Sequence, residues 1–107
     1  MGTCTWPIGN GQGLSFKVHT QEANWKQVPG LYIFARSAHG AWDPLYVGQT
    51  EDFCTRIPDH ERWDEAARLG AVYVHAVVIR DAETRNRLEE ALIRYLNPPL
   101  NTQLRRI

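Results

Sequence analysis

Apolar residues recur along the chain in patterns that predict four strands. Residues 14–19, "LSFKVH", alternate apolar and polar positions, which predicts a short edge strand. Residues 30–36 and 44–49, "GLYIFAR" and "PLYVGQ", are rich in β-branched and aromatic side chains. The turn-forming segment 37–44 between them predicts an antiparallel hairpin with a long loop. Residues 71–79, "AVYVHAVVI", are almost all apolar, which predicts a central strand buried on both faces.

Two short helices are predicted after this hairpin. Thr50 and Asp52 are suitable N-caps for a helix that runs through Arg56, and Pro58 should kink or end that helix. A second helix is predicted over residues 61–70, "ERWDEAARLG", because the glycine at its end suits the C′ position that closes a helix.

A longer amphipathic helix is predicted over residues 81–97, with Asp81 as N-cap and two prolines after its end. Its apolar face holds Leu88, Ala91, Leu92, Tyr95 and Leu96. At 100° per residue, Glu90 falls opposite this face and should be solvated, whereas Glu89 falls at its border. A carboxylate at that border can reach a cleft between helix and sheet and be partly desolvated there.

The order of these elements favours an α+β sandwich, with helices flanking a small central mixed β-sheet. Residues 1–13 contain four glycines and a proline, so we expect an irregular N-terminal arm there. Residues 14–107 are then expected to form a single domain, since a domain of this length supports one core.

The charge balance argues against tight non-specific binding of nucleic acid. The chain has twelve basic and twelve acidic residues, whereas proteins that bind nucleic acid by counterion release usually carry a basic excess. Most of the basic residues are arginines, however, and arginine suits bidentate contact with phosphate. Any contact with nucleic acid should therefore rest on a few focused side chains.

The sequence shows no pattern that indicates a zinc site, a disulfide framework or a membrane span. Cys4 and Cys54 form no CxxC pair and have no matching histidine spacing, so neither zinc nor a disulfide framework is indicated. His19, His39 and His75 have no partner at a useful spacing and are read as structural residues. No apolar run approaches the ~18 residues of a membrane span, so no membrane contact and a cytoplasmic location are expected.

Six sequence elements occur together at fixed spacings between residues 29 and 101. They are Gly30-Leu31-Tyr32, Tyr46-Val47-Gly48, Arg56 eight residues after Gly48, His60 four residues later, Glu89 three residues before Leu92-Ile93, and Asn101 twelve residues after Glu89. Together they resemble the motifs of the GIY-YIG nuclease family. Leu31 replaces the middle isoleucine of the first tripeptide, and the loop between the two tripeptides is slightly longer than usual in that family.

This resemblance implies a GIY-YIG fold and a metal-dependent endonuclease that acts on DNA. It implies that Glu89 holds one Mg²⁺ or Mn²⁺ ion and that Arg56 neutralises the non-bridging phosphate oxygens. Tyr32 is the first candidate for the general base; Tyr46 and His60 remain open for that role, and either His60 or Arg56 could lower the pKa of Tyr32.

The remaining motif residues are given supporting roles by the same resemblance. Asn101 would hold Glu89 or the substrate backbone, while Gly30 and Gly48 would allow close approach of the backbone. A function in DNA repair or recombination is one expectation. The alternatives are a non-catalytic nucleic-acid- or protein-binding module that kept the fold, and a structure-selective nuclease active only with a partner subunit. A partner protein or a homodimer is expected to supply specificity.

Overall fold

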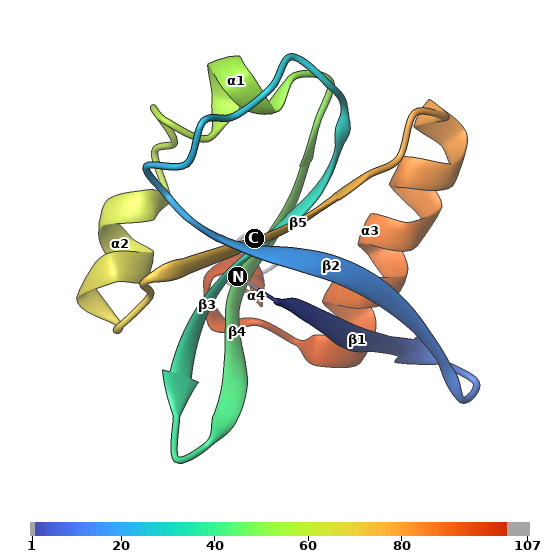
Figure 1. Cartoon of the computed structure of the whole chain (residues 1–107). Helices are drawn as coiled ribbons and strands as arrows, with labels where there is room; N and C mark the ends of the chain where they lie inside the picture. Colours follow the sequence, from blue (N-terminus) through green and yellow to red (C-terminus); the bar gives the residue numbers. More distant parts are fainter. Residues whose placement is uncertain (1, 103–107) are drawn as a thin grey trace.

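Five strands form an antiparallel sheet in the computed structural model, which describes residues 2–102. The strands are β1 (Thr3–Gly9), β2 (Gln12–Thr20), β3 (Gly30–Ala38), β4 (Ala41–Thr50) and β5 (Tyr73–Val78). Their order across the sheet is β1-β2-β5-β3-β4, so β1 and β4 are the edges (Figure 1).

Helices cover both faces of this sheet because side chains alternate along each strand. The helices are α1 (Phe53–Arg56), α2 (Trp63–Arg68), α3 (Ala82–Leu96) and α4 (Pro99–Thr102). Tyr32 and Phe34 of β3 point to the face covered by α1, α2 and α4. Leu31 and Ile33 point to the opposite face, where Leu92 of α3 is fully buried.

The α+β fold class predicted from the sequence is confirmed, and 71–79 does supply the central strand, β5. The prediction of a mixed sheet was wrong, because every neighbouring pair of strands is antiparallel. The N-caps Asp52 and Asp81 were predicted correctly: each side chain accepts a hydrogen bond from a backbone N–H of the first helical turn.

The predicted irregular arm at residues 1–13 is instead a strand, β1, paired with β2. Two of its four glycines, Gly9 and Gly11, lie at the turn between the strands, with φ of 102° and 72°. The segment before them alternates, with Trp6 buried against the face that α3 covers. Strand β2 is therefore an internal strand and not the edge strand that the alternation of residues 14–19 predicted.

The hairpin of β3 and β4 was predicted correctly, but its long loop was not. The strands extend to Ala38 and Ala41 and leave a two-residue turn of His39 and Gly40, with φ of 54° and 78°. Two consecutive positive φ values match the turn type that suits the twist of a two-stranded hairpin. The segment that resembled a loop therefore continues both strands.

The buried face of helix α3 differs from the face that its apolar residues predicted. Tyr95, expected on that face, is 58% exposed, whereas Arg85 is only 5% exposed. Arg85 lies at about 60° on the wheel that puts Leu88 at 0°, so the buried face is centred nearer to Glu89, at about 100°. The apolar pattern alone missed this because a charged residue belongs to the buried face.

None of the helices within residues 2–102 is long and apolar enough to cross a lipid bilayer. The predicted domain extended to residue 107, and its last five residues lie outside the part of the chain that the structure describes. The α+β core formed by β3, β4, β5 and the helices carries all six motif elements.

Candidate active site

The two motif glycines are required by close packing. Gly48 pairs with Tyr32 across the β3–β4 ladder, and a Cβ atom at residue 48 would lie 2.5 Å from both Cζ and Oη of Tyr32. A Cβ atom at Gly30 would lie 2.6 Å from Cζ of Phe53 and would also meet the carbonyl oxygen of Val77. The phenol ring of Tyr32 therefore crosses β4 over a residue that has no side chain.

Tyr32 and His60 form a buried hydrogen bond, with 2.7 Å between Oη and Nε2. The backbone N–H of Arg62 donates to Nδ1 of His60 at 3.0 Å. Because Nδ1 accepts, the proton of the neutral imidazole lies on Nε2 and is donated to the oxygen of Tyr32. Burial, and after it the positive charge of Arg56, lowers the pKa of His60 to about 4, which keeps the ring neutral at pH 7.

Burial also raises the pKa of the Tyr32 phenol, and the neighbouring Tyr46 raises it further. The guanidinium of Arg56 opposes this effect but does not cancel it. Burial likewise raises the pKa of Tyr46. The rings of Tyr46 and His60 are in edge contact, with centroids 5.2 Å apart. Both tyrosines are therefore protonated at neutral pH unless additional positive charge is brought close to them.

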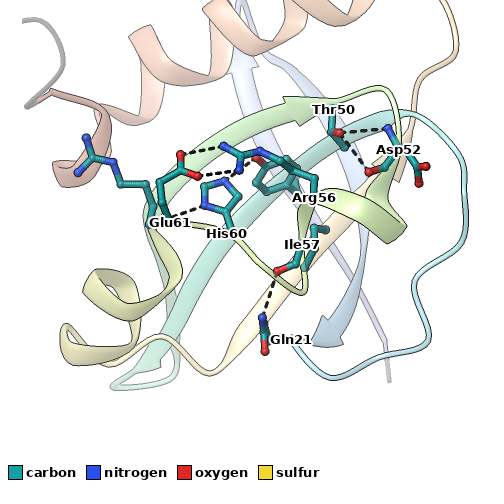
Figure 2. Close-up of polar contacts among 9 residues, drawn as sticks. Gln21, Thr50, Asp52, Arg56, Ile57, His60 and Glu61 are labelled. Atoms are coloured by element: carbon teal, nitrogen blue, oxygen red, sulfur yellow. Dashed lines mark hydrogen bonds and ion pairs between the residues drawn. The ribbon is translucent and has the colours of Figure 1, made fainter.

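Arg56, the last residue of α1, is held by a carboxylate that sequence reasoning did not single out. Its guanidinium donates to both oxygens of Glu61, at 2.7 and 2.8 Å, and Figure 2 shows this pair beside His60. The side chains of Arg56 and Glu61 are 34% and 64% exposed. The hydrogen bonds from Arg56 lower the pKa of Glu61 to about 2. The exposed carboxylate occupies the donors that would bind a phosphate.

His60 does not continue the helix that carries Arg56. Helix α1 ends at Arg56, and the segment that includes Pro58 is irregular until α2 begins. The amide of Gln21 donates to the carbonyl oxygens of Ile57 and Pro58 at 3.0 and 3.2 Å, one of which is drawn in Figure 2. Gln21 thus supports the irregular segment from the β2–β3 connection, a role that no sequence motif indicated.

Glu89 lies on α3 and is half-buried. Gln49 donates from Nε2 to Oε1 of Glu89 at 3.0 Å and to the side-chain oxygen of Asn86, and its own oxygen accepts from Nε of Arg85 at 3.0 Å. Burial raises the pKa of Glu89. Its negative charge acts on Tyr32 and raises the pKa of that phenol. Within residues 2–102 Glu89 takes part in no ion pair, so its half-buried carboxylate has no cation beside it.

Gln49 and Arg85 were not proposed from the sequence, although both had a signal. Gln49 directly follows Gly48, and Arg85 lies one helical turn before Glu89. Arg85 is buried, and its guanidinium also donates to the carbonyl oxygen of Ile79 at 3.1 Å, just after β5, which compensates part of the cost of burying the charge. Together they fix the position of Glu89 without neutralising it.

Asn101 forms its hydrogen bonds with Val47 and not with Glu89, contrary to one of the roles given to it from the sequence. Its side chain accepts from the N–H of Val47 at 2.7 Å and donates to the carbonyl oxygen of Val47 at 2.9 Å. Asn101 is 4% exposed and pairs with the outer edge of β4 as another strand would. The structure therefore makes Asn101 a residue that positions the strand between Tyr46 and Gly48.

The fold thus gathers Tyr32, Tyr46, His60 and Arg56 on one face of the sheet. Glu89 is supplied by α3 from the other face, and Asn101 supports β4 between them. Over residues 2–102 no group of three or more His, Cys, Asp or Glu side chains could hold a metal ion together. A cation at this site would have one protein carboxylate, an arrangement that suits Mg²⁺, which keeps most of its water.

Comparison with known proteins supports this fold at low sequence identity. No protein-family model matches the chain, and no curated protein matches it. Solved structures of the GIY-YIG N-terminal endonuclease domain of UvrC from Thermotoga maritima do match. The domain bound to its catalytic divalent cation, magnesium, has a TM-score of 0.58 and 22% identity, covering 71% of this chain and 85% of that chain.

A second structure of the same domain, a point mutant bound to its catalytic divalent cation, gives the same TM-score and identity and is covered over 84% of its length. At this identity the likeness concerns the fold. The chain has the fold of GIY-YIG endonuclease domains, as its motifs indicated.

Proposed function

We propose that the protein is a metal-dependent endonuclease that hydrolyses DNA phosphodiester bonds. The observation that carries this proposal is the half-buried carboxylate of Glu89, which lacks a cationic partner within residues 2–102. Its charge acts on the buried Tyr32 and on the half-buried Tyr46. A carboxylate in such a place is costly unless a cation neutralises it. The match to a domain that binds a catalytic divalent cation supports the same reading.

Mg²⁺ or Mn²⁺ fits the donors at Glu89. One oxygen of Glu89 accepts from the neutral amide of Gln49, and the other accepts no hydrogen bond from the residues that the structure describes. A hard cation prefers such an oxygen and takes its remaining ligands from water and phosphate. When bound, the ion supplies positive charge to the phosphate and to the attacking water.

Tyr32 is proposed as the general base, with His60 as its hydrogen-bond donor. His60 uses Nδ1 to accept from Arg62 and Nε2 to donate to Tyr32, so it has no lone pair left to take a proton from water. A donor aimed at Oη stabilises a phenolate more than a phenol, which favours loss of the Tyr32 proton once positive charge arrives. Tyr46 stays the second candidate for this role.

Arg56 is proposed to bind the non-bridging oxygens of the scissile phosphate. A bidentate guanidinium matches two phosphate oxygens as well as it matches the carboxylate of Glu61. Removal of one such contact in a transition state typically costs about 3–4 kcal/mol. Glu61 is largely exposed, so it can leave Arg56 without being transferred out of water.

The experiment that tests this proposal is nicking of supercoiled plasmid in the presence of Mg²⁺ or Mn²⁺. Wild-type protein should nick the plasmid only with metal, and Glu89→Gln and Arg56→Ala should each reduce the rate at least ~100-fold. Glu90→Gln is the matched control, because Glu90 is the neighbouring exposed carboxylate on α3. Equal activity in Glu89→Gln and wild type would point to a contaminating nuclease or another site.

A second candidate function is a binding module that kept the fold without catalysis. The net charge of zero and the engagement of Arg56 by Glu61 favour it. Branched and flapped DNA should therefore be tested if plasmid is not cut, and intact substrates throughout would reject the nuclease in favour of this second function. A role in repair or recombination, a partner subunit or homodimer that supplies specificity, and a cytoplasmic location stay predictions.

A further inference from the structure

A groove of about 530 Å³ lies beside the candidate active site. It is lined by β2 and β5, by the connection between β2 and β3, and by Phe53 of α1. Its volume falls within the ~300–1,000 Å³ of typical small-molecule sites. In Figure 1 the β2–β3 connection passes beside α1, to which it is tied by the hydrogen bond from the N–H of Phe53 to the carbonyl oxygen of Val28 at 3.0 Å.

The groove and Tyr32 share one face of the sheet and one row of paired residues. Lys17 of β2 pairs with Ala76 of β5, and Ala76 pairs with Tyr32 of β3. Directly paired residues of antiparallel strands point to the same face, and neighbouring strands lie ~4.8 Å apart. The backbones at Lys17 and Tyr32 are therefore separated by about 10 Å, a few nucleotides of a strand whose stacked rise is ~3.4 Å.

The charge of the groove suits an anion. Lys17 and Lys26 are the only lysines of the chain, and both line this groove from exposed positions. None of the described residues that line it is acidic. In a protein with no net charge, this places a local positive charge next to a candidate phosphate-cleaving site.

The wall of the groove suits a flat apolar group. The Trp25 ring is fixed there, because its N–H donates to the carbonyl oxygen of Gln21 at 3.0 Å and its centroid lies 5.7 Å from that of Phe53. Val78 is 46% exposed at the same wall. Phe53 is also in edge contact with Tyr32, so the ring of Phe53 alone separates the groove from Tyr32, the proposed general base.

We infer that this groove binds an unpaired nucleotide of the substrate, with the base against the apolar wall and the phosphate on Lys17 and Lys26. Apolar and aromatic surface combined with a cationic rim is the chemistry that holds single-stranded nucleic acid. The inference rests on the proposed function and makes it more specific: the substrate carries a single-stranded segment beside the bond that is cut.

The test is a titration of ¹⁵N-labelled Glu89→Gln protein with a short single-stranded oligonucleotide and, separately, with a blunt duplex, followed by NMR. Amide shifts for the single strand should be concentrated at residues 17, 24–28 and 76–78. Lys17→Gln combined with Lys26→Gln should weaken single-strand binding at least tenfold at low salt. The double variant should also reduce the magnitude of the slope of log binding constant against log salt concentration by about 1.4, since each lost phosphate contact on a single strand removes ~0.7.

Arg68→Gln combined with Arg94→Gln is the matched control, because it removes the same charge from two exposed positions outside the groove. This pair should bind the single strand like the parent. Equal losses in the two double variants, shifts outside the groove, or stronger shifts with an acidic peptide of the same charge would each overturn the inference.

Failure of the inference and failure of the proposed function remain distinguishable. Plasmid nicking that depends on Glu89, together with no binding at the groove, would reject the groove and leave the nuclease. Single-strand binding at the groove without any cleavage that depends on Glu89 would support the binding function of the groove and reject the nuclease.

Discussion

His60 and His75 are both buried, and burial lowers the pKa of each to about 4, yet they do different things. His60 uses both ring nitrogens, one for a backbone N–H and one for Tyr32. His75 accepts from the indole N–H of Trp6 at 2.9 Å, and its Nε2 finds no partner among the described residues. Its ring packs edge-on against Trp42, with centroids 4.5 Å apart.

The difference lies in the surroundings of each ring and not in its burial. Arg56 lies near His60, and its positive charge helps to lower the pKa of that ring. His75 lies on the opposite face, among the apolar side chains under α3, where it holds Trp6 of β1 against β5. A perturbed histidine therefore indicates a functional site here only when its partner is itself able to react.

The largest effect should separate the two faces by activity. Tyr32→Phe keeps the ring but removes the proposed base, so the nicking rate should fall by ~10²–10⁴. Trp6→Phe removes the donor to His75 and should lower the free energy of unfolding by about 1–3 kcal/mol, with little change in nicking. Nicking assays and urea unfolding of both variants check this. Equal nicking by Tyr32→Phe and wild type would transfer the role of base to Tyr46.

The next effect concerns the glycine under Tyr32. A methyl group at residue 48 would lie 2.5 Å from the phenol and must displace it. Gly48→Ala should therefore reduce nicking at least tenfold and destabilise the fold by about 1–3 kcal/mol. Gly2→Ala is the control, since a Cβ atom there meets nothing within 4 Å. Full activity in Gly48→Ala would mean that the position of Tyr32 is not important for cleavage.

The pH dependence of stability should contain both histidines. Each has a folded pKa of about 4, below the ~6.5 of an unfolded chain, so the unfolded state binds more protons between these values. Stability should rise from pH 4 to 6.5 and be lost as the pH falls through that window. Each ring contributes up to roughly 3 kcal/mol to the change in the free energy of unfolding across this pH window. Urea unfolding of wild type, His60→Gln and His75→Gln at pH 4.5 and 7 checks the sum and its two parts.

One substitution should divide this titration between the two rings. Arg56→Gln removes a positive charge that lowers the pKa of His60, and it leaves Glu61 free to stabilise the charged imidazole. The pKa of His60 should therefore rise while that of His75 stays unchanged, as NMR of the imidazole protons would show. Parallel shifts of both rings would mean that the substitution loosens the whole sheet.

The smallest effect is expected at the exposed ion pair. Glu61→Gln should change the free energy of unfolding by less than ~1 kcal/mol, because exposed ion pairs contribute little. It should raise the affinity for DNA a few-fold by freeing Arg56, measured by fluorescence anisotropy. Glu65→Gln breaks the neighbouring pair with Arg62 and serves as control. Unchanged affinity in Glu61→Gln would show that Glu61 does not compete with phosphate.

Local patterns were sufficient for much of the fold and for the motif residues. Runs rich in β-branched and aromatic residues predicted β3 and β4, and an almost wholly apolar run predicted β5. Capping residues such as Asp81 predicted where α3 begins. Both kinds of signal depend only on neighbours in the sequence. The motif spacings pointed to the fold that the UvrC domains share. The glycines of the first thirteen residues were wrongly taken as a sign of an irregular arm. The amino-acid composition of a segment does not distinguish a glycine in a hairpin turn from a glycine in an irregular loop.

Only the tertiary structure decided how these residues meet. The sequence determined that Glu89 lies at the border of an apolar helix face, but the burial of Arg85 rotated that face and placed Glu89 beside Gln49. It determined that Asn101 follows a helix, but not that its amide would pair with Val47, fifty-four residues away. Such contacts depend on which strand edges and helix faces remain unpaired after the sheet has formed, and no local pattern records that.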